Sequence, residues 1–176
     1  MLFRGIVVEE DIVYSTKRIR ADFGYVAARE IYSPLTQITQ TIIKEIKPNT
    51  PDHYWSFERI KLKINSFRLD NRVFLLIDSA AYQVHVESVE FERVSNIEEK
   101  RKDIMTVDSS KVSVVTGYEQ NQSNDYRLSY TIEPTLIEKI KTANEISFRY
   151  YTGPDMITVP MGKFNLTTLK MLIEKQ

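Results

Sequence analysis

Histidine is the residue on which most nucleophilic chemistry in this chain would depend, and there are only two. His53 lies in a proline-containing segment, and His85 lies in an alternating segment together with Glu87. Nucleophilic catalysis needs a base beside the nucleophile. His85 with Glu87 or Asp78 gives a hydrolase hypothesis, but no Gly-x-Ser-x-Gly motif accompanies it. We therefore expect both histidines to be structural and the protein not to be an enzyme.

Other catalytic and cofactor chemistries lack the residues they need. The chain has no cysteine, which excludes thiolate catalysis and cysteine-based metal sites. It also has no His-Glu-x-x-His motif for zinc. Its five glycines are widely separated, whereas a phosphate loop needs glycines close together so that backbone N–H groups converge on the anion. We predict no catalytic residue, no metal site and no cofactor.

A basic and aromatic strand face is the first feature that favours binding. Arg59, Lys61 and Lys63 alternate along one segment, and Trp55 and Phe57 precede them. Cations interleaved with aromatic rings are typical of platforms for single-stranded nucleic acid. The segment therefore supports a nucleic-acid-binding module as an alternative function.

The charge of the chain argues against that alternative. Lys plus Arg number 24 and Asp plus Glu number 24, so no net charge attracts the protein to nucleic acid or to an anionic membrane. Residues 53–74 carry a net charge of +3 and residues 75–98 a net charge of −4. Because we expect these segments to be hairpin neighbours, we expect the acidic strand to neutralise the basic one.

Tyrosines near the ends of the predicted strands are the second feature that favours binding. Tyrosine combines an apolar ring with a polar tip, which suits interfaces and ligand pockets. Arg149 lies between two aromatic residues on a predicted central strand, where its guanidinium must pair with a carboxylate or reach the surface. The complete set of predicted binding residues is Trp55, Arg59, Lys61, Lys63, Tyr82, His85, Arg149 and Tyr151.

Residues 1–50 are expected to be a mixture of strand and helix. Residues 21–32 fit a helix and a strand about equally well. After Ser33-Pro34, apolar residues recur at spacings of three and four until Pro48. This spacing predicts a helix over 34–47.

Residues 51–176 are expected to form the body of an antiparallel sheet. The apolar residues alternate within several predicted strands and shift frame near Glu87 or Ser88, which indicates a β-bulge or a bend between sheet layers. The polar run 119–125 is interpreted as a long hairpin loop. Helices are predicted from Pro134 to about Asn144 and after Asn165, and Gly153 is expected to turn the chain between two antiparallel strands.

Together these elements predict a single α+β domain over residues 1–176. Its mainly antiparallel, twisted or partly closed sheet would have about six to eight strands, with about three packing helices. The N-terminus lacks a secretory signal and no stretch of about 18 apolar residues occurs, so we expect a cytoplasmic location without membrane insertion. The high isoleucine and low glycine content suggests a bacterial genome. The preferred function is a non-catalytic binding or interaction domain that contacts a protein or small ligand.

Overall fold

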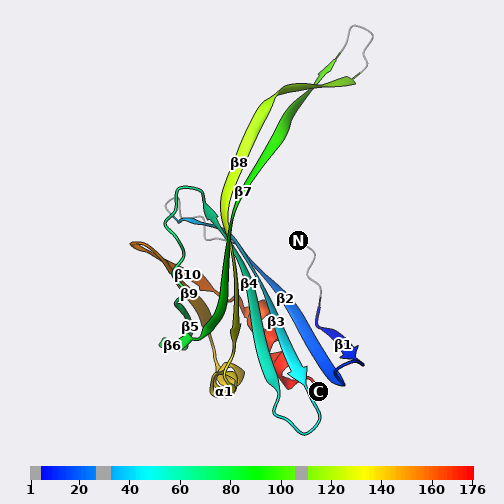
Figure 1. The fold of residues 1–176 in the computed structure, drawn as a ribbon, viewed down its shortest axis with the longest axis vertical. Helices are drawn as coiled ribbons and strands as arrows, with labels where there is room; N and C mark the ends of the chain where they lie inside the picture. The colour runs from blue at the N-terminus through cyan, green and yellow to red at the C-terminus, as the bar shows by residue number, and fades with distance from the viewer. Residues whose placement is uncertain (1–4, 27–32, 106–110) are drawn as a thin grey trace.

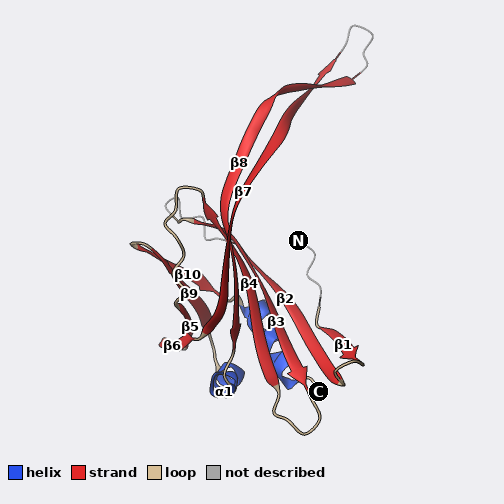
Figure 2. Cartoon of the chain, viewed as in Figure 1, coloured by secondary structure: helices blue, strands red, loops and turns tan. Residues whose placement is uncertain are grey.

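The protein is built mainly from β-strands. The computed structural model describes residues 5–26, 33–105 and 111–176, of which 64% lie in strands and 13% in helices. The strands form two antiparallel sheets, and two helices pack with them (Figures 1 and 2). The prediction of an α+β domain with about three helices is therefore wrong: strands dominate, and one predicted helix is a strand.

The larger sheet has six strands and curls into a half-barrel. Its spatial order is β1-β2-β3-β4-β8-β7, and every neighbouring pair is antiparallel. Helix α2 (Lys163–Glu174) contacts β2 on the inner side of the curl. The six strands are β1 (Val7–Asp11), β2 (Thr16–Val26), β3 (Leu35–Ile46), β4 (His53–Lys63), β7 (Val86–Met105) and β8 (Lys111–Thr131).

The smaller sheet has four strands in the order β10-β9-β5-β6. They are β5 (Val73–Ile77), β6 (Ala80–Val84), β9 (Ile146–Thr152) and β10 (Asp155–Pro160). Helix α1 (Pro134–Thr142) connects β8 to β9 and has proline in its first turn, as predicted. Only His85 separates β6 from β7, so the chain passes there from one sheet to the other, and the register shift between Val86 and Ser88 confirms the predicted bulge.

The predicted helix over 34–47 is wrong, because these residues form strand β3. Ile38 and Ile42 are buried in the core, and Gln40 and Lys44 are buried between and beside them. A spacing of four is compatible with alternation in a strand as well as with a helix. Because polar residues occupy two of the inward positions, the apolar residues of the sequence do not show the period of two that is typical of a strand. The many threonines and isoleucines nevertheless favour a strand.

Other expectations were met in part. Residues 21–26 are strand, and residues 27–32 lie outside the described part of the chain. The predicted loop 119–125 is instead part of β8, and residues 96–103, which are mostly polar, are part of β7. The antiparallel pair β9–β10 is confirmed. Helix α1 ends at an extended Ala143 rather than a left-handed Asn144, and Gly162 rather than Asn165 precedes α2.

Gly153 makes the tight turn between β9 and β10 possible. Its φ is +57°, and an added Cβ would lie 2.5 Å from Cγ of Phe67. A left-handed conformation is costly for a residue with a Cβ. We expect Gly153→Ala to lower the free energy of unfolding by about 1–3 kcal/mol in urea denaturation. Gly117→Ala, where nothing lies within 4 Å, should change it by less than about 0.5 kcal/mol, and equal effects would contradict this explanation.

Candidate functional site

The predicted binding residues do not gather in one place. Four lie on strand β4, at positions that alternate with its buried residues and therefore face outward from the half-barrel. Two lie on β9 at the partly exposed positions of the smaller sheet. The remaining two are a half-buried tyrosine on β6 and the exposed histidine that follows it. In the order of these groups, the residues are Trp55, Arg59, Lys61 and Lys63, then Arg149 and Tyr151, then Tyr82 and His85.

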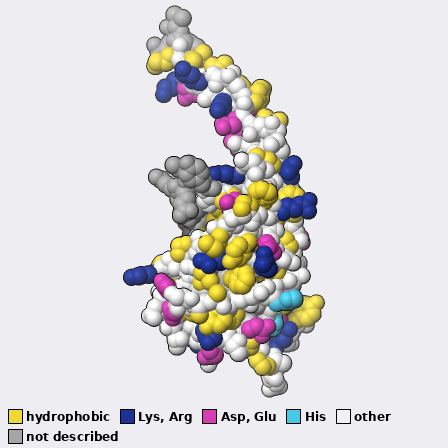
Figure 3. Space-filling view, turned by 90° about the vertical axis from the view of Figure 1, so that its left-hand side faces the viewer, with side chains coloured by type: hydrophobic (Ala, Val, Ile, Leu, Met, Phe, Trp, Pro, Cys, Tyr) yellow, Lys and Arg dark blue, Asp and Glu magenta, His cyan; other side chains and the backbone are white. Residues whose placement is uncertain are grey.

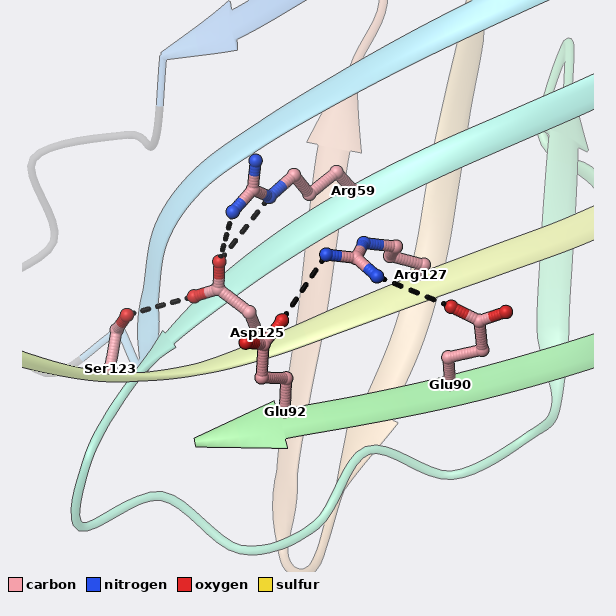
Figure 4. A network of polar contacts seen from close by, with 6 residues as sticks. All are labelled: Arg59, Glu90, Glu92, Ser123, Asp125 and Arg127. Carbon is pink, nitrogen blue, oxygen red and sulfur yellow. Dashed lines mark hydrogen bonds and ion pairs between the residues drawn. The ribbon is translucent and has the colours of Figure 1, made fainter. Parts of the chain in front are cut away.

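The outer face of β4 carries a row of aromatic rings followed by cations. The ring centroids of His53 and Trp55 are 4.7 Å apart, and those of Trp55 and Phe57 are 6.3 Å apart. Next along the strand, Arg59 donates to Oδ2 of Asp125 on β8 at 2.7 Å (Figure 4). The carboxylate of Asp125 is fully buried. One of the three cations of the predicted platform, Arg59, is therefore paired with a carboxylate of the same chain.

A second arginine on this face is also paired. Arg127 of β8 lies between Glu90 and Glu92 of β7, at 3.4 Å and 3.2 Å (Figure 4). The sequence-based expectation that the basic and acidic segments are hairpin neighbours is wrong, because β8 lies between β4 and β7 and β5 belongs to the other sheet. A groove of about 360 Å³ runs over this region and is lined by Thr39, Thr41, Phe57, Arg59, Ser88 and Arg127. Its charges are neutralised by carboxylates from β7 and β8.

Two residues of the hydrolase hypothesis, Asp78 and Glu87, have structural contacts. Oδ1 of Asp78 accepts backbone N–H groups of Asn144 and Glu145 at 2.9 Å and 3.0 Å. Asp78 and Ser79 both have positive φ, as a two-residue hairpin turn between β5 and β6 requires. Thr131 donates to the carboxylate of Glu87. Within the described ranges no cluster of three or more His, Cys, Asp or Glu residues could hold a metal ion.

The smaller sheet carries three of the predicted binding residues on its strands β9 and β6: Arg149, Tyr151 and Tyr82. Nε of Arg149 donates to Oγ1 of Thr158 on the neighbouring strand at 3.2 Å. The guanidinium of Arg72 lies 5.7 Å from the ring centroid of Tyr151, and Nζ of Lys139 lies 5.3 Å from that of Tyr82. Both rings thus lie against a cation of the same chain.

A buried carboxylate was missed by the sequence analysis. Glu58 points inward from β4 and is fully buried; it accepts hydrogen bonds from the hydroxyls of Tyr130 (2.5 Å) and Tyr150 (2.8 Å) and from Nε2 of Gln40 (3.0 Å). Tyr25 donates in turn to Oε1 of Gln40 at 2.7 Å. Burial raises the pKa of Glu58 to about 7, although its three donors oppose this shift. Since Tyr150 belongs to β9, this network joins the two sheets.

The largest surface feature is a hairpin arm, which we define as residues 94–105 of β7 and 111–123 of β8. These two segments continue far beyond the body (Figure 1) and, in the described part of the chain, pair only with each other, except that Ser123 also pairs with Lys63 of β4. Apolar and basic side chains gather along its distal part (Figure 3). The exposed apolar residues of the arm are Ile97, Ile104, Met105, Val112, Val114, Val115 and Tyr118.

The two edges of the six-stranded sheet differ in charge. Strand β1 has the sequence Val-Val-Glu-Glu-Asp over Val7–Asp11 and pairs on one side with β2. The distal part of β7 has the sequence Lys-Arg-Lys-Asp-Ile-Met over residues 100–105 and pairs on one side with β8. Beside β1 lies a groove of about 410 Å³, lined by residues that include Ile12, Ile46 and Pro48.

Comparisons with family models, curated proteins and solved structures found no match for this chain. Across the described residues, no helix is both long enough and apolar enough to cross a membrane.

Proposed function

We propose that the protein is a non-catalytic interaction module that binds a protein partner through the β7–β8 arm. The observation that carries the proposal is the exposure of the arm's apolar side chains, 46% at Ile104, 71% at Met105 and 70% at Tyr118. A two-stranded ribbon is at best marginally stable alone in water. Ile104 and Val112 are also directly paired across the ribbon, and exposed apolar side chains that lie side by side are typical of an interaction surface. A partner that covers the arm would supply the burial that the ribbon lacks.

The arm favours a protein over a nucleic acid. Its cations are accompanied by carboxylates: Lys100 pairs with Glu119 at 3.0 Å and Arg101 with Glu99 at 2.7 Å. Binding to a phosphate backbone depends on cations that displace counterions. A ribbon edge, in contrast, offers backbone N–H and C=O groups to which another strand can pair. We place this interaction in the cytoplasm, in accordance with the sequence-based expectation.

Photo-crosslinking in the cells of origin tests the proposal. Benzoyl-phenylalanine replaces Ile104 or Val114 on the arm, or Thr135 on α1 as the control position. We expect one discrete protein adduct from both arm positions and none from Thr135, because only the arm is covered. Absence of an adduct at both arm positions would overturn the proposal.

Removal of the arm should leave the body folded. Val94 and Ser123 are paired neighbours, so residues 95–122 can be replaced by Asn-Gly, which closes a two-residue hairpin turn. The core residues lie outside the deleted segment. We expect Tm to change by no more than about 3 °C, measured by circular dichroism. If the body unfolds without the arm, the arm is needed for folding and is not a separate interaction element.

A further inference from the structure

We propose that the partner is a second copy of this chain, joined head to tail: the basic distal edge of β7 in one copy pairs with the acidic edge strand β1 of the next. This inference rests on the proposed function of the arm. It identifies the partner of that same surface. The argument uses the topology of the sheet, the sequences of its two edges and their charges.

The topology supplies one edge of each kind in every copy. β1 and β7 are the two ends of the strand order β1-β2-β3-β4-β8-β7, and in the described part of the chain each pairs on one side alone. Figure 1 shows the arm leaving the body at the end opposite to β1. The two edges of one molecule are therefore placed to meet other molecules rather than each other.

Antiparallel pairing brings opposite charges together at the three acidic positions of β1, and Val8 then lies opposite Asp103. In that alignment Glu9 lies opposite Lys102, Glu10 opposite Arg101 and Asp11 opposite Lys100. Val7 then lies opposite Ile104. Opposite charges in directly facing pairs stabilise a sheet and like charges destabilise it.

Other alignments of the same edges are poorer. Parallel pairing can also join three opposite-charge pairs, Glu9 with Lys100, Glu10 with Arg101 and Asp11 with Lys102, but it places Val7 and Val8 against the carboxylates of Glu98 and Glu99. Two copies of β1 paired antiparallel would place Glu9 against Glu9 and apolar valines against carboxylates. The head-to-tail antiparallel arrangement is thus the one that the charges and the apolar pair of Val7 and Ile104 favour together.

Most of the charged side chains of both edges are exposed, whereas Asp11 is 25% exposed and lies 3.9 Å from Arg18. Glu9 and Glu10 are exposed on β1. The present partners of Lys100 and Arg101 are carboxylates of the arm itself, and all four side chains are 44–59% exposed. Exposed ion pairs are weak, so exchanging them for intermolecular pairs costs little. Because the contact joins two different surfaces, repetition produces a ring or a filament.

Charge reversal on each edge, followed by mixing, tests the inference in the full-length protein. The variants are Arg101→Glu/Lys102→Glu on the arm and Glu9→Lys/Glu10→Lys on β1. Asp11 is retained because its carboxylate accepts the N–H groups of Val13 and Tyr14 in the turn. Sedimentation velocity at about 100 μM should show species larger than a monomer for the wild type, monomers for each variant alone, and restored assembly in the equimolar mixture.

Each of the other outcomes has a defined meaning. Three results would overturn head-to-tail pairing: a wild type that remains monomeric, an arm variant that is monomeric while the β1 variant still assembles, or a mixture that stays monomeric. An arm-to-arm contact would give the second of these results. If the arm instead forms an adduct with a different protein in the crosslinking experiment, this inference fails and the proposed function stands; if no adduct forms, both fail.

Cysteine pairs test the register directly, since the chain has no cysteine of its own. Directly opposite residues in an antiparallel pair are close enough for a disulfide. After mild oxidation, a Glu9→Cys/Lys102→Cys variant should give a ladder of covalent oligomers in non-reducing electrophoresis. The control, Glu9→Cys/Thr135→Cys, should not give it. Equal ladders from both variants would contradict the register.

Discussion

Glu58→Gln is expected to remove most of the pH dependence of stability between about pH 4.5 and pH 7. The carboxyl group of a glutamate has an ordinary pKa of 4.5, and that of Glu58 is raised to about 7 in the folded protein, because burial disfavours its charged form. The folded state therefore binds the proton more tightly than the unfolded state. The stability that this provides is fully present below pH 4.5 and is lost as the pH rises through 7.

The size of this effect follows from the difference in pKa. One pKa unit corresponds to about 1.4 kcal/mol, so the shift of Glu58 represents roughly 3 kcal/mol of unfolding free energy. Glutamine has nearly the same shape and no charge. It can still accept the hydroxyl hydrogen bond of Tyr130, and its amide nitrogen can donate to the hydroxyl of Tyr150. We therefore expect the variant to be more stable than the wild type at pH 8 and similar to it at pH 4.5.

Urea denaturation at a series of pH values measures this difference. Glu90→Gln is the matched control, because Glu90 is an exposed carboxylate paired with Arg127 on the surface. Its curve should follow that of the wild type within about 0.5 kcal/mol. If Glu58→Gln has the same pH dependence as the wild type, or if it is strongly destabilised at pH 8, the buried carboxyl group does not control the profile.

The parts of the fold that the sequence predicted well are those in which local pattern and environment agree. Strand β5 has an apolar sequence and alternates between buried and half-buried positions, and α1 begins at a proline with three buried residues on one side. The prediction for the residues of strand β3 was wrong because two of its inward positions are occupied by Gln40 and Lys44, whose partners come from distant parts of the chain. A sequence window carries no information about such partners.

The candidate interaction surface was missed for a different physical reason. Both faces of the arm are solvent-exposed, so its strands lack the alternation by which half-buried strands are identified. Its polar residues at 119–125 therefore suggested a loop. Likewise, Glu58 is one of 24 acidic residues, and only the inward register of β4 distinguishes it from the others.

Lys44→Met is expected to lower the free energy of unfolding by about 2–4 kcal/mol. Nζ of Lys44 donates to the backbone carbonyls of Ile173 and Lys175 at 2.9 Å and 2.8 Å, and it lies 3.0 Å from the carboxylate of Asp52. The side chain is 4% exposed. The last carbonyls of a helix carry a partial negative charge and lack partners within the helix. Lys44 thus binds the end of α2 to the inner face of the half-barrel through hydrogen bonds.

Methionine keeps most of the side-chain volume, so this substitution tests the charge and its hydrogen bonds rather than packing. Lys47→Met is the matched control: Lys47 is 52% exposed and pairs with Glu45 on the surface. Thermal and urea unfolding should show a change of less than about 0.5 kcal/mol for the control. Hydrogen exchange should show faster opening of α2 in the Lys44 variant, because the carbonyls at the helix end lose a buried donor. Equal stability of the two variants would mean that α2 is held by its apolar face alone, through Leu169, Leu172 and Ile173.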